Sequence, residues 1–256
     1  SVSFFAIFMW VSAPVNVQHY SYETTVGQQL DTRFADGSII HLNTNSRIEA
    51  EFTKDKRIIK LVKGEALFEV AHDPQRPFIV YAGDRLVQAV GTKFIVHLQS
   101  ENIEVTVTDG KVKMSQVETD SSLEDIRSLD SVTINKDDLF IAKGEQAIAE
   151  HDQVPELIHI KSDNLQRELS WLDGKLVFEN EKLSDIIEEI NRYSDIKVIL
   201  KDTALHNLKI SGRFDLGDSR AVIEAIELAF NVSSSQIDAH SVLLTKKQSL
   251  EYMCPD

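Results

Sequence analysis

Between residues 23 and 150, apolar side chains gather in short runs of strand length separated by turns that contain glycine. β-branched and aromatic residues fill the runs at 78–81, 94–97 and 103–107, and the last run alternates apolar and polar positions. Dipeptides ending in glycine occur at 36–37, 63–64, 82–83, 109–110 and 143–144. The pattern predicts a mainly β domain over residues 23–150, folded as a sandwich or as a solenoid.

After residue 150 the pattern changes to strands that alternate with amphipathic helices. One helix is predicted from Ser184, as its cap, to Tyr193, and a second from about Ser219 to Phe230, with Asp218 or Ser219 as its cap; each has apolar side chains on one face. Short runs at 175–178, 197–200, 208–214 and 242–245 predict the strands. We expect a connector over 151–170, a small α/β domain of β-α-β-β-α-β order over 171–247 with its helices over one sheet, and a tail over 248–256.

The first residues of the chain are almost wholly apolar. Residues 2–11 carry no charge, yet they are only about half as long as the ~20-residue stretch that spans a membrane, and they lack the basic start of a signal peptide. We interpret residues 1–13 as the end of a transmembrane helix, with Trp10 near the membrane interface and Pro14 ending the helix, followed by a linker over 14–22. The alternative is a buried first strand or helix.

Composition narrows the expected partners. The chain has 256 residues, 42% of them hydrophobic, which is enough for one large domain or two modest ones. Its 27 Lys and Arg stand against 41 Asp and Glu, and the formal net charge of -14 repels phosphate backbones, so we expect no nucleic-acid partner. The one cysteine, Cys254, leaves no internal disulfide and no cysteine-based zinc site.

The sequence lacks the motifs of familiar enzyme sites. No pair among the eight histidines has the i, i+2 or i, i+4 spacing that places two metal ligands on one element. There is no Gly-x-Ser-x-Gly elbow and no glycine-rich phosphate loop. We therefore expect no metal, no cofactor and no turnover of a metabolite.

One dipeptide, Gly91-Thr92, has the chemistry needed for self-cleavage. A threonine hydroxyl that follows a glycine carbonyl can attack it when the backbone is strained, which forms an ester that water opens. Glycine suits this position because it has no Cβ to obstruct the attack. His97 is a candidate base, but strict alternation along a strand puts it on the face opposite Thr92 unless a bulge intervenes. The alternative is an ordinary strand with a packed glycine.

Six segments, in this order, resemble the FecR-like regulators, the membrane anti-sigma factors of bacterial ferric-siderophore and polysaccharide signalling. Each segment alone is a weak signal, but their order makes the resemblance specific, and it covers nearly the whole chain. Phe34 stands where many members carry leucine, a departure that affects packing only. The segments are residues 34–43, with Asp-Gly-Ser at 36–38, and residues 63–70, 76–80, 90–96, 171–178 and 190–193.

The resemblance implies a cytoplasmic sigma-binding segment upstream, one span of the inner membrane, and a periplasmic region that this chain represents. It implies that residues 171–247 are similar to the short N-terminal (STN) domain of secretins and TonB-dependent receptors. The implied partners are the signalling domain of an outer-membrane TonB-dependent transporter, an extracytoplasmic-function sigma factor bound through the upstream segment, and site proteases. Many members also cut themselves at a Gly-Thr pair, which is Gly91 and Thr92 here.

The strand over residues 208–214 is the segment that we predict to receive the partner. An exposed sheet edge can pair with a strand of another chain, with backbone hydrogen bonds giving affinity and alternate side chains giving specificity. The alternative is a central strand already paired on both sides. The predicted partner-binding residues are Leu208, Ile210, Gly212 and Phe214.

The expected function is therefore reception of an extracytoplasmic signal by protein binding, with self-cleavage as at most a single-turnover event. Two alternatives belong to other classes. One is a cell-envelope scaffold or glycan-binding β-rich protein, and the other is an intramolecular self-processor whose purpose is the cut itself.

Overall fold

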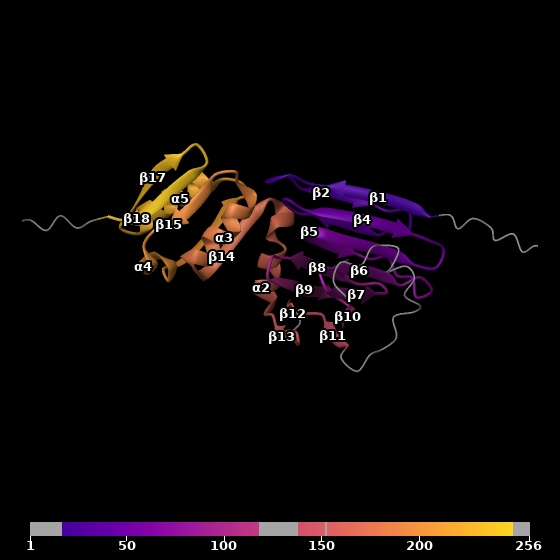
Figure 1. The fold of residues 1–256 in the computed structure, drawn as a ribbon. Helices are drawn as coiled ribbons and strands as arrows, with labels where there is room; N and C mark the ends of the chain where they lie inside the picture. Colours follow the sequence, from indigo (N-terminus) through magenta and orange to yellow (C-terminus); the bar gives the residue numbers. More distant parts are fainter. Residues whose placement is uncertain (1–16, 118–137, 152, 248–256) are drawn as a thin grey trace, which may run out of the picture.

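The computed structural model describes residues 17–117, 138–151 and 153–247, which form a large β domain and a smaller α/β domain (Figure 1). The predicted membrane-helix end at 1–13 and the tail at 248–256 lie outside the described residues. Among the residues that are described, no helix is long and apolar enough to cross a membrane.

Runs of alternating or of continuous apolar positions produce the strands of the first domain, which join into one 13-stranded sheet. Neighbouring strands pair antiparallel, except that β5 and β6 are parallel. The strands are β1 (Gln18–Glu23), β2 (Leu30–Arg33), β3 (Ile39–Leu42), β4 (Arg47–Phe52), β5 (Arg57–Glu69), β6 (Phe78–Ala82), β7 (Arg85–Ala89), β8 (Lys93–Leu98), β9 (Asn102–Asp109), β10 (Lys111–Gln116), β11 (Leu139–Ala142), β12 (Glu145–Glu150) and β13 (Glu156–His159).

Strand β5 belongs to both halves of this sheet. Its first half pairs with β4 and β6, and its second half pairs with β3 and β8. Gly64 lies between the halves with φ of +80°, and a Cβ there would lie 2.7 Å from the Cα of Ser46. Only glycine fits such a position, so the glycine allows the strand to bend and the sheet to fold over itself in two layers.

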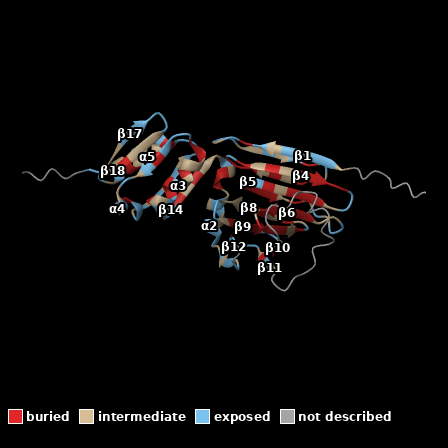
Figure 2. Cartoon of the chain, in the orientation of Figure 1, coloured by how far each residue is buried: buried red, intermediate tan, exposed pale blue. Residues whose placement is uncertain are grey.

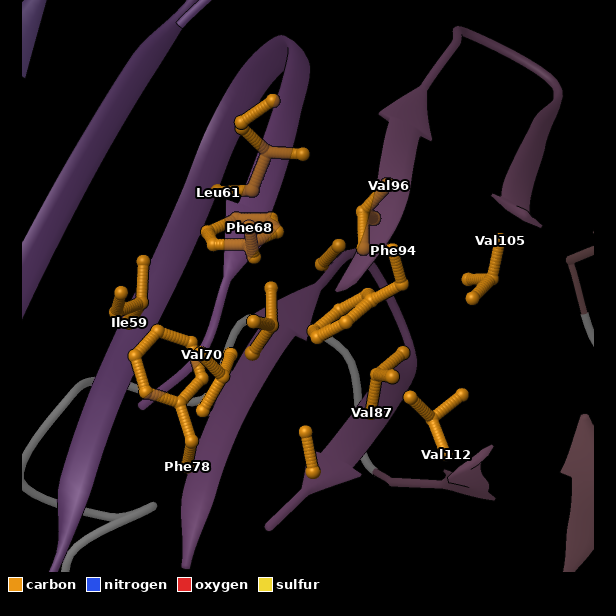
Figure 3. Close-up of a cluster of buried hydrophobic side chains, with 14 of the residues drawn as sticks. Ile59, Leu61, Phe68, Val70, Phe78, Val87, Phe94, Val96, Val105 and Val112 are labelled. Atoms are coloured by element: carbon orange, nitrogen blue, oxygen red, sulfur yellow. The ribbon is translucent and has the colours of Figure 1, made fainter. Parts of the chain in front are cut away.

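The two layers enclose one apolar core. Phe68 stacks on Phe94 with ring centroids 5.3 Å apart, and Phe78 meets Phe68 edge-on at 5.9 Å. Figure 3 shows these rings with Leu61 and Val96 directed into the same space. In Figure 2 the burial is densest over β5, β6 and β8. The prediction of a mainly β domain is confirmed, and of its two forms the sandwich describes the enclosed core better than the solenoid does.

The second domain alternates helices and strands. Helix α5 begins after Asp218, whose carboxylate accepts the Ala221 N–H at 3.0 Å, as predicted for one of the two candidate caps. Ser184 does not cap α3 but lies inside it, with its hydroxyl on Asp185. The elements are α2 (Ser162–Glu168), the 3-10 helix η1 (Ser170–Asp173), β14 (Lys175–Lys182), α3 (Leu183–Tyr193), β15 (Lys197–Leu200), α4 (Thr203–His206), β16 (Lys209–Asp215), α5 (Ser219–Ala229), β17 (Val232–Asp238) and β18 (Ser241–Lys246).

The expectation of helices over a single sheet was wrong. Strands β14 and β16 form one antiparallel pair, while β15, β18 and β17 form a separate three-stranded sheet in which β15 is parallel to β18. Side chains from both sheets and from α3 and α5 share one core. Strand β17 was missed because its three consecutive serines, 233–235, are typical of a turn, although Val232 at its start is buried. A small domain of strands and helices is therefore confirmed, but its predicted arrangement over one sheet is not.

The folded domains also extend into both segments that were predicted as connections. β1 lies in the predicted linker, where it pairs with β4 while Tyr20 packs edge-on against Phe34 at 4.9 Å. β13 pairs with β12, and α2 follows it, both within the predicted connector. Alternation in these segments is short and half exposed, so the pairing with a neighbouring strand decides their structure.

Candidate functional site

Gly91 and Thr92 lie in the link between β7 and β8, where the chain passes from one layer of the sandwich to the other. They are therefore outside the strand in which they were predicted. The segment 70–73 runs beside this link, and two backbone hydrogen bonds join the two segments. Val70 N–H donates to the Thr92 carbonyl at 2.9 Å, and Asp73 N–H donates to the Val90 carbonyl at 2.9 Å.

The Gly91-Thr92 peptide is tightly packed on both sides. A Cβ on Gly91 would lie 2.5 Å from Nδ1 of His72 and 3.0 Å from its Cα, so no other residue fits there. On the other side, Gly110 leaves room for the Thr92 methyl group. Thr92 is 8% exposed, and its hydroxyl oxygen is buried with no hydrogen-bond partner. An unpaired buried hydroxyl is costly, and such groups are typical of reactive or strained positions.

A buried ion pair holds the segment that packs on Gly91. Arg57 is fully buried and donates to Asp36 at 2.7 Å, to the Ala71 carbonyl at 3.0 Å and to the Arg76 carbonyl at 2.9 Å. Burial alone would raise the pKa of Asp36, but hydrogen bonds from Arg57 and Ser38 outweigh it and hold the pKa below its ordinary value. The Asp-Gly-Ser segment at 36–38 thus fixes the 71–76 segment.

A shallow cavity of about 310 Å³ opens beside Thr92. Its charged lining residues include Glu69 and Lys93, which pair at 2.6 Å, and Asp109. The hydrogen bond from Lys93 lowers the pKa of Glu69. The second step of a cut through an ester requires water, and this cavity is the open space next to the Gly91-Thr92 peptide.

Strand β16 has one partner among the described strands, β14, so it lies at the edge of a two-stranded sheet. Its residues alternate strictly between half-buried and exposed positions. Of the predicted partner-binding residues, Leu208, Ile210 and Phe214 pack against the core of their own domain. The Phe214 ring covers Gly212, where a Cβ would lie 2.8 Å from the ring.

These four residues therefore support the strand from below. The exposed surface beside the open edge is formed by the side chains at the alternate positions of β16. These residues were not predicted from the sequence to bind the partner. They are Lys209, Ser211, Arg213 and Asp215.

A third polar site joins the two domains. The Arg192 guanidinium donates to Glu65 of β5 at 2.5 Å and to both carboxylate oxygens of Glu189 at 2.9 and 3.0 Å. Asn43 donates to the Tyr193 hydroxyl at 2.7 Å and to Glu65 at 2.9 Å. Below them, Leu67 and Ile95 of the β domain pack into the core of the α/β domain. The two domains therefore share both an apolar contact and a polar network.

A cavity of about 410 Å³ lies within this junction. Burial lowers the pKa of His97, on its wall, to about 4, so the histidine is neutral there. The bulge at Lys93 and Phe94 does not bring His97 to Thr92, because the histidine faces the junction instead. Burial would raise the pKa of Glu65, but the charge of Arg192 and the hydrogen bonds from Arg192 and Asn43 lower it overall.

Three further carboxylates near the cavity have raised pKa values. Burial, followed by the negative charge of the neighbouring Glu65, raises the pKa of Glu104. Glu168 lies on the wall of the same cavity, where the loss of contact with bulk water, followed by the negative charges of Glu65 and Glu104, raises its pKa to about 8. Burial raises the pKa of Glu189 in spite of Arg192. In the described part of the chain, no group of three His, Cys, Asp or Glu side chains could hold a metal ion.

Sequence reasoning missed His72, Arg57 and the Arg192–Glu65 pair. Arg192 and Glu65 lie within segments that the family resemblance singled out, residues 190–193 and 63–70, and Asp36, the partner of Arg57, lies in the Asp-Gly-Ser segment. That signal could have indicated the pairs, because a charged residue that becomes buried needs a partner of opposite charge.

Two family models match the chain. The model described as "FecR protein" matches residues 20–113, and the model described as "FecR, C-terminal" matches residues 175–244. The first match includes Gly91 and Thr92, and the second runs from β14 to β18. No curated protein matches the chain.

The fold is also found in solved structures. Two crystal structures of a proposed anti-sigma factor from Parabacteroides distasonis ATCC 8503, at 1.65 and 2.50 Å resolution, match with TM-scores of 0.69 and 0.68. Each is 23% identical, and the match covers 90% of this chain and 100% of that chain. At this identity the similarity shows a shared fold and no more.

Proposed function

The chain belongs to the FecR family, and from this premise we propose that it is the signal-receiving region of a membrane anti-sigma factor. The observation that carries the proposal is the order of the two family matches, one on each folded domain. A region of this kind relays the state of an outer-membrane transporter to a sigma factor in the cytoplasm. The similar fold of a proposed anti-sigma factor supports it.

The proposed receptor is the signalling domain of a TonB-dependent transporter, which adds a strand to β16. The open edge of β16 supports this, because unpaired backbone N–H and C=O groups attract another strand. The exposed side chains of β16 then set specificity, while Ile210 and Phe214 keep the strand on its core.

Self-cleavage between Gly91 and Thr92 is the proposed processing step. The unpartnered buried hydroxyl of Thr92 and the space that Gly91 leaves for its neighbours support it. Intact mass spectrometry tests this step. Fragments that end at Gly91 and begin at Thr92, and that vanish in Thr92→Ala, are expected, whereas a single intact mass for the original chain would reject the step.

The proposed location is the periplasm, with one inner-membrane span before the β domain and a sigma-binding segment on the cytoplasmic side. Site proteases that cut the anchored protein complete the relay. The apolar residues 2–11 motivate this layout. A reporter enzyme active only outside the cytoplasm, fused after residue 247 of the membrane-anchored protein, should be active, and an inactive fusion would refute the layout.

Titration calorimetry with a receptor signalling domain tests the binding. The probe is the signalling domain of the transporter encoded beside this protein. Ser211→Asp on β16 should weaken binding at least tenfold, because a charged aspartate beside an edge opposes strand addition. Ser211 is exposed, but its hydroxyl accepts from the Asn180 N–H at 2.8 Å, so circular dichroism and thermal unfolding must show that the variant keeps the fold of the original chain.

The matched control is Ser235→Asp on β17, which is also exposed and also on an edge strand, but in the other sheet. It should leave the affinity unchanged. If Ser235→Asp weakens binding and Ser211→Asp does not, β17 and not β16 receives the partner. Absence of binding by the original chain would refute the receptor assignment itself.

A further inference from the structure

We propose that His72 is the residue that moves the proton when the Gly91-Thr92 bond is cut. The inference rests on the self-cleavage proposed above and adds a catalytic residue to it. Nothing in the strand pattern around Thr92 indicated this histidine, because it belongs to a segment between β5 and β6.

The first reason is contact. Of the atoms that a Cβ on Gly91 would meet, the three nearest all belong to His72, and Nδ1 is the nearest at 2.5 Å. The imidazole therefore lies against the open face of the residue whose carbonyl would be attacked. Histidine is also the side chain that most often accepts and returns a proton near neutral pH.

The second reason is that the backbone fixes this contact. The hydrogen bonds from Val70 to Thr92 and from Asp73 to Val90 lie on either side of it, which places His72 across from Gly91. The Arg57–Asp36 pair then holds the same segment through the Ala71 carbonyl. A histidine on such a support stays close to the peptide without depending on its own side-chain hydrogen bonds.

The third reason is that no other proton acceptor is hydrogen-bonded to the Thr92 hydroxyl. Its oxygen is buried and unpartnered, while Glu69, which lines the cavity beside it, is paired with Lys93 at 2.6 Å. In the proposed step, the His72 ring turns so that one of its nitrogens accepts the proton of the hydroxyl. Hydrogen bonds of catalytic groups commonly form only as the reaction begins.

The steps balance as follows. Thr92 Oγ1 bonds to the Gly91 carbonyl carbon while its proton passes to His72. The bond between that carbon and the Thr92 nitrogen then breaks, and His72 returns the proton to the nitrogen, which leaves an ester and a free amine. Water opens the ester, giving a Gly91 carboxylate and restoring the Thr92 hydroxyl.

Timed cell-free synthesis of the 256-residue chain, followed by intact mass spectrometry, tests the role of His72. His72→Gln should cut about 100-fold more slowly than the original chain, within the range of general acid–base catalysis. His72→Ala should regain part of the rate when imidazole is added, which a loss of packing alone would not allow.

The control is His240→Gln, at an exposed turn of the other domain, which should cut at the original rate. Equal rates for His72→Gln and the original chain would overturn the role of His72 while leaving self-cleavage intact. An original chain that stays whole, even in hydroxylamine, which opens esters, would overturn the self-cleavage itself and this inference with it.

Discussion

Two arginine–carboxylate pairs, Arg57–Asp36 in the β domain and Arg192–Glu65 at the junction, use the same chemistry in different surroundings. The side chains of the first pair are 0% and 3% exposed, and those of the second are 22% and 5% exposed. The first pair is enclosed by its own domain, whereas the second joins two domains beside a cavity of about 410 Å³.

This difference in burial indicates which contact in the molecule can break without unfolding a domain. An enclosed pair forms only with the fold that surrounds it, so breaking it should unfold the domain. A pair at a junction that admits water can break while each domain keeps its own core. The β domain therefore serves as a rigid support, and the junction is the place where a signal could alter the arrangement.

The largest expected effect comes from breaking the enclosed pair. Arg57→Met should destabilise the β domain by about 3–5 kcal/mol, because Asp36 is left as an unpaired buried charge. Urea unfolding measures this loss. The control, Arg47→Met, removes a pair with Glu49 that is 41% and 34% exposed, and it should cost less than about 1 kcal/mol. Equal losses in the two variants would contradict the comparison.

Breaking the junction pair should have a smaller effect and one of another kind. Arg192→Met should weaken the contact between the domains by about 1.5–3 kcal/mol, the usual contribution of a hydrogen bond to a charged group. Calorimetric unfolding should then separate into two transitions, with that of the β domain unchanged. Arg220→Met, at an exposed position of α5, is the control and should keep the original profile. A single transition shifted as in Arg57→Met would refute the distinction.

The junction should also depend on pH. The folded-state pKa of Glu65 is lowered, so its contribution is present above the unfolded pKa and is lost as the pH falls. The lowered pKa of His97 acts in the same direction, because charging the buried imidazole costs stability below its ordinary pKa of 6.5. The raised pKa of Glu168 acts oppositely, and its contribution is lost as the pH rises through about 8.

We therefore expect the contact between the domains to weaken as the pH falls below about 4.5, where Glu65 and His97 take up protons, and to weaken as the pH rises from about 6.5 to 8, where Glu168 loses its proton. The fluorescence of Trp171, buried at the junction, reports this in a Trp10→Phe background, because the chain has two tryptophans. Glu168→Gln should remove the alkaline part of the profile. A flat profile between pH 5 and 9 would contradict the assignment of these carboxylates to the junction.

The smallest expected effect comes from the hydrogen bond between Asn43 and Tyr193 at the junction. Tyr193→Phe removes the hydroxyl that accepts from Asn43 at 2.7 Å, while the same amide keeps its bond to Glu65. The loss should be about 1 kcal/mol in calorimetric unfolding. A loss as large as that of Arg192→Met would mean that Tyr193, and not the ion pair, holds the domains together.

Local signals were enough to predict most of the elements. Alternation predicted the strand at 103–107, which is β9, and the Asp218 cap marked the start of α5. β17 could not be predicted this way, because its serines form a strand through pairing with β18 and not through their own preference. Element type follows from local pattern, and sheet membership follows from tertiary pairing.

The sites follow the same division. Gly91 and Thr92 are adjacent in sequence, so their chemistry could be proposed from the sequence alone. His72 is brought to them by two backbone hydrogen bonds, and Arg192 reaches Glu65 across 127 positions of sequence. No spacing rule contains such contacts, because only the folded sandwich and the docked second domain create them.

Hydrogen exchange at the edge of β16 tests the central claim most directly. When the receptor signalling domain binds, the amides of β16 should exchange more slowly, while those of β6 and β8 in the sandwich core keep their rates. Unchanged exchange at β16, with new protection at the edge strands β2 or β13 of the β domain instead, would contradict the account.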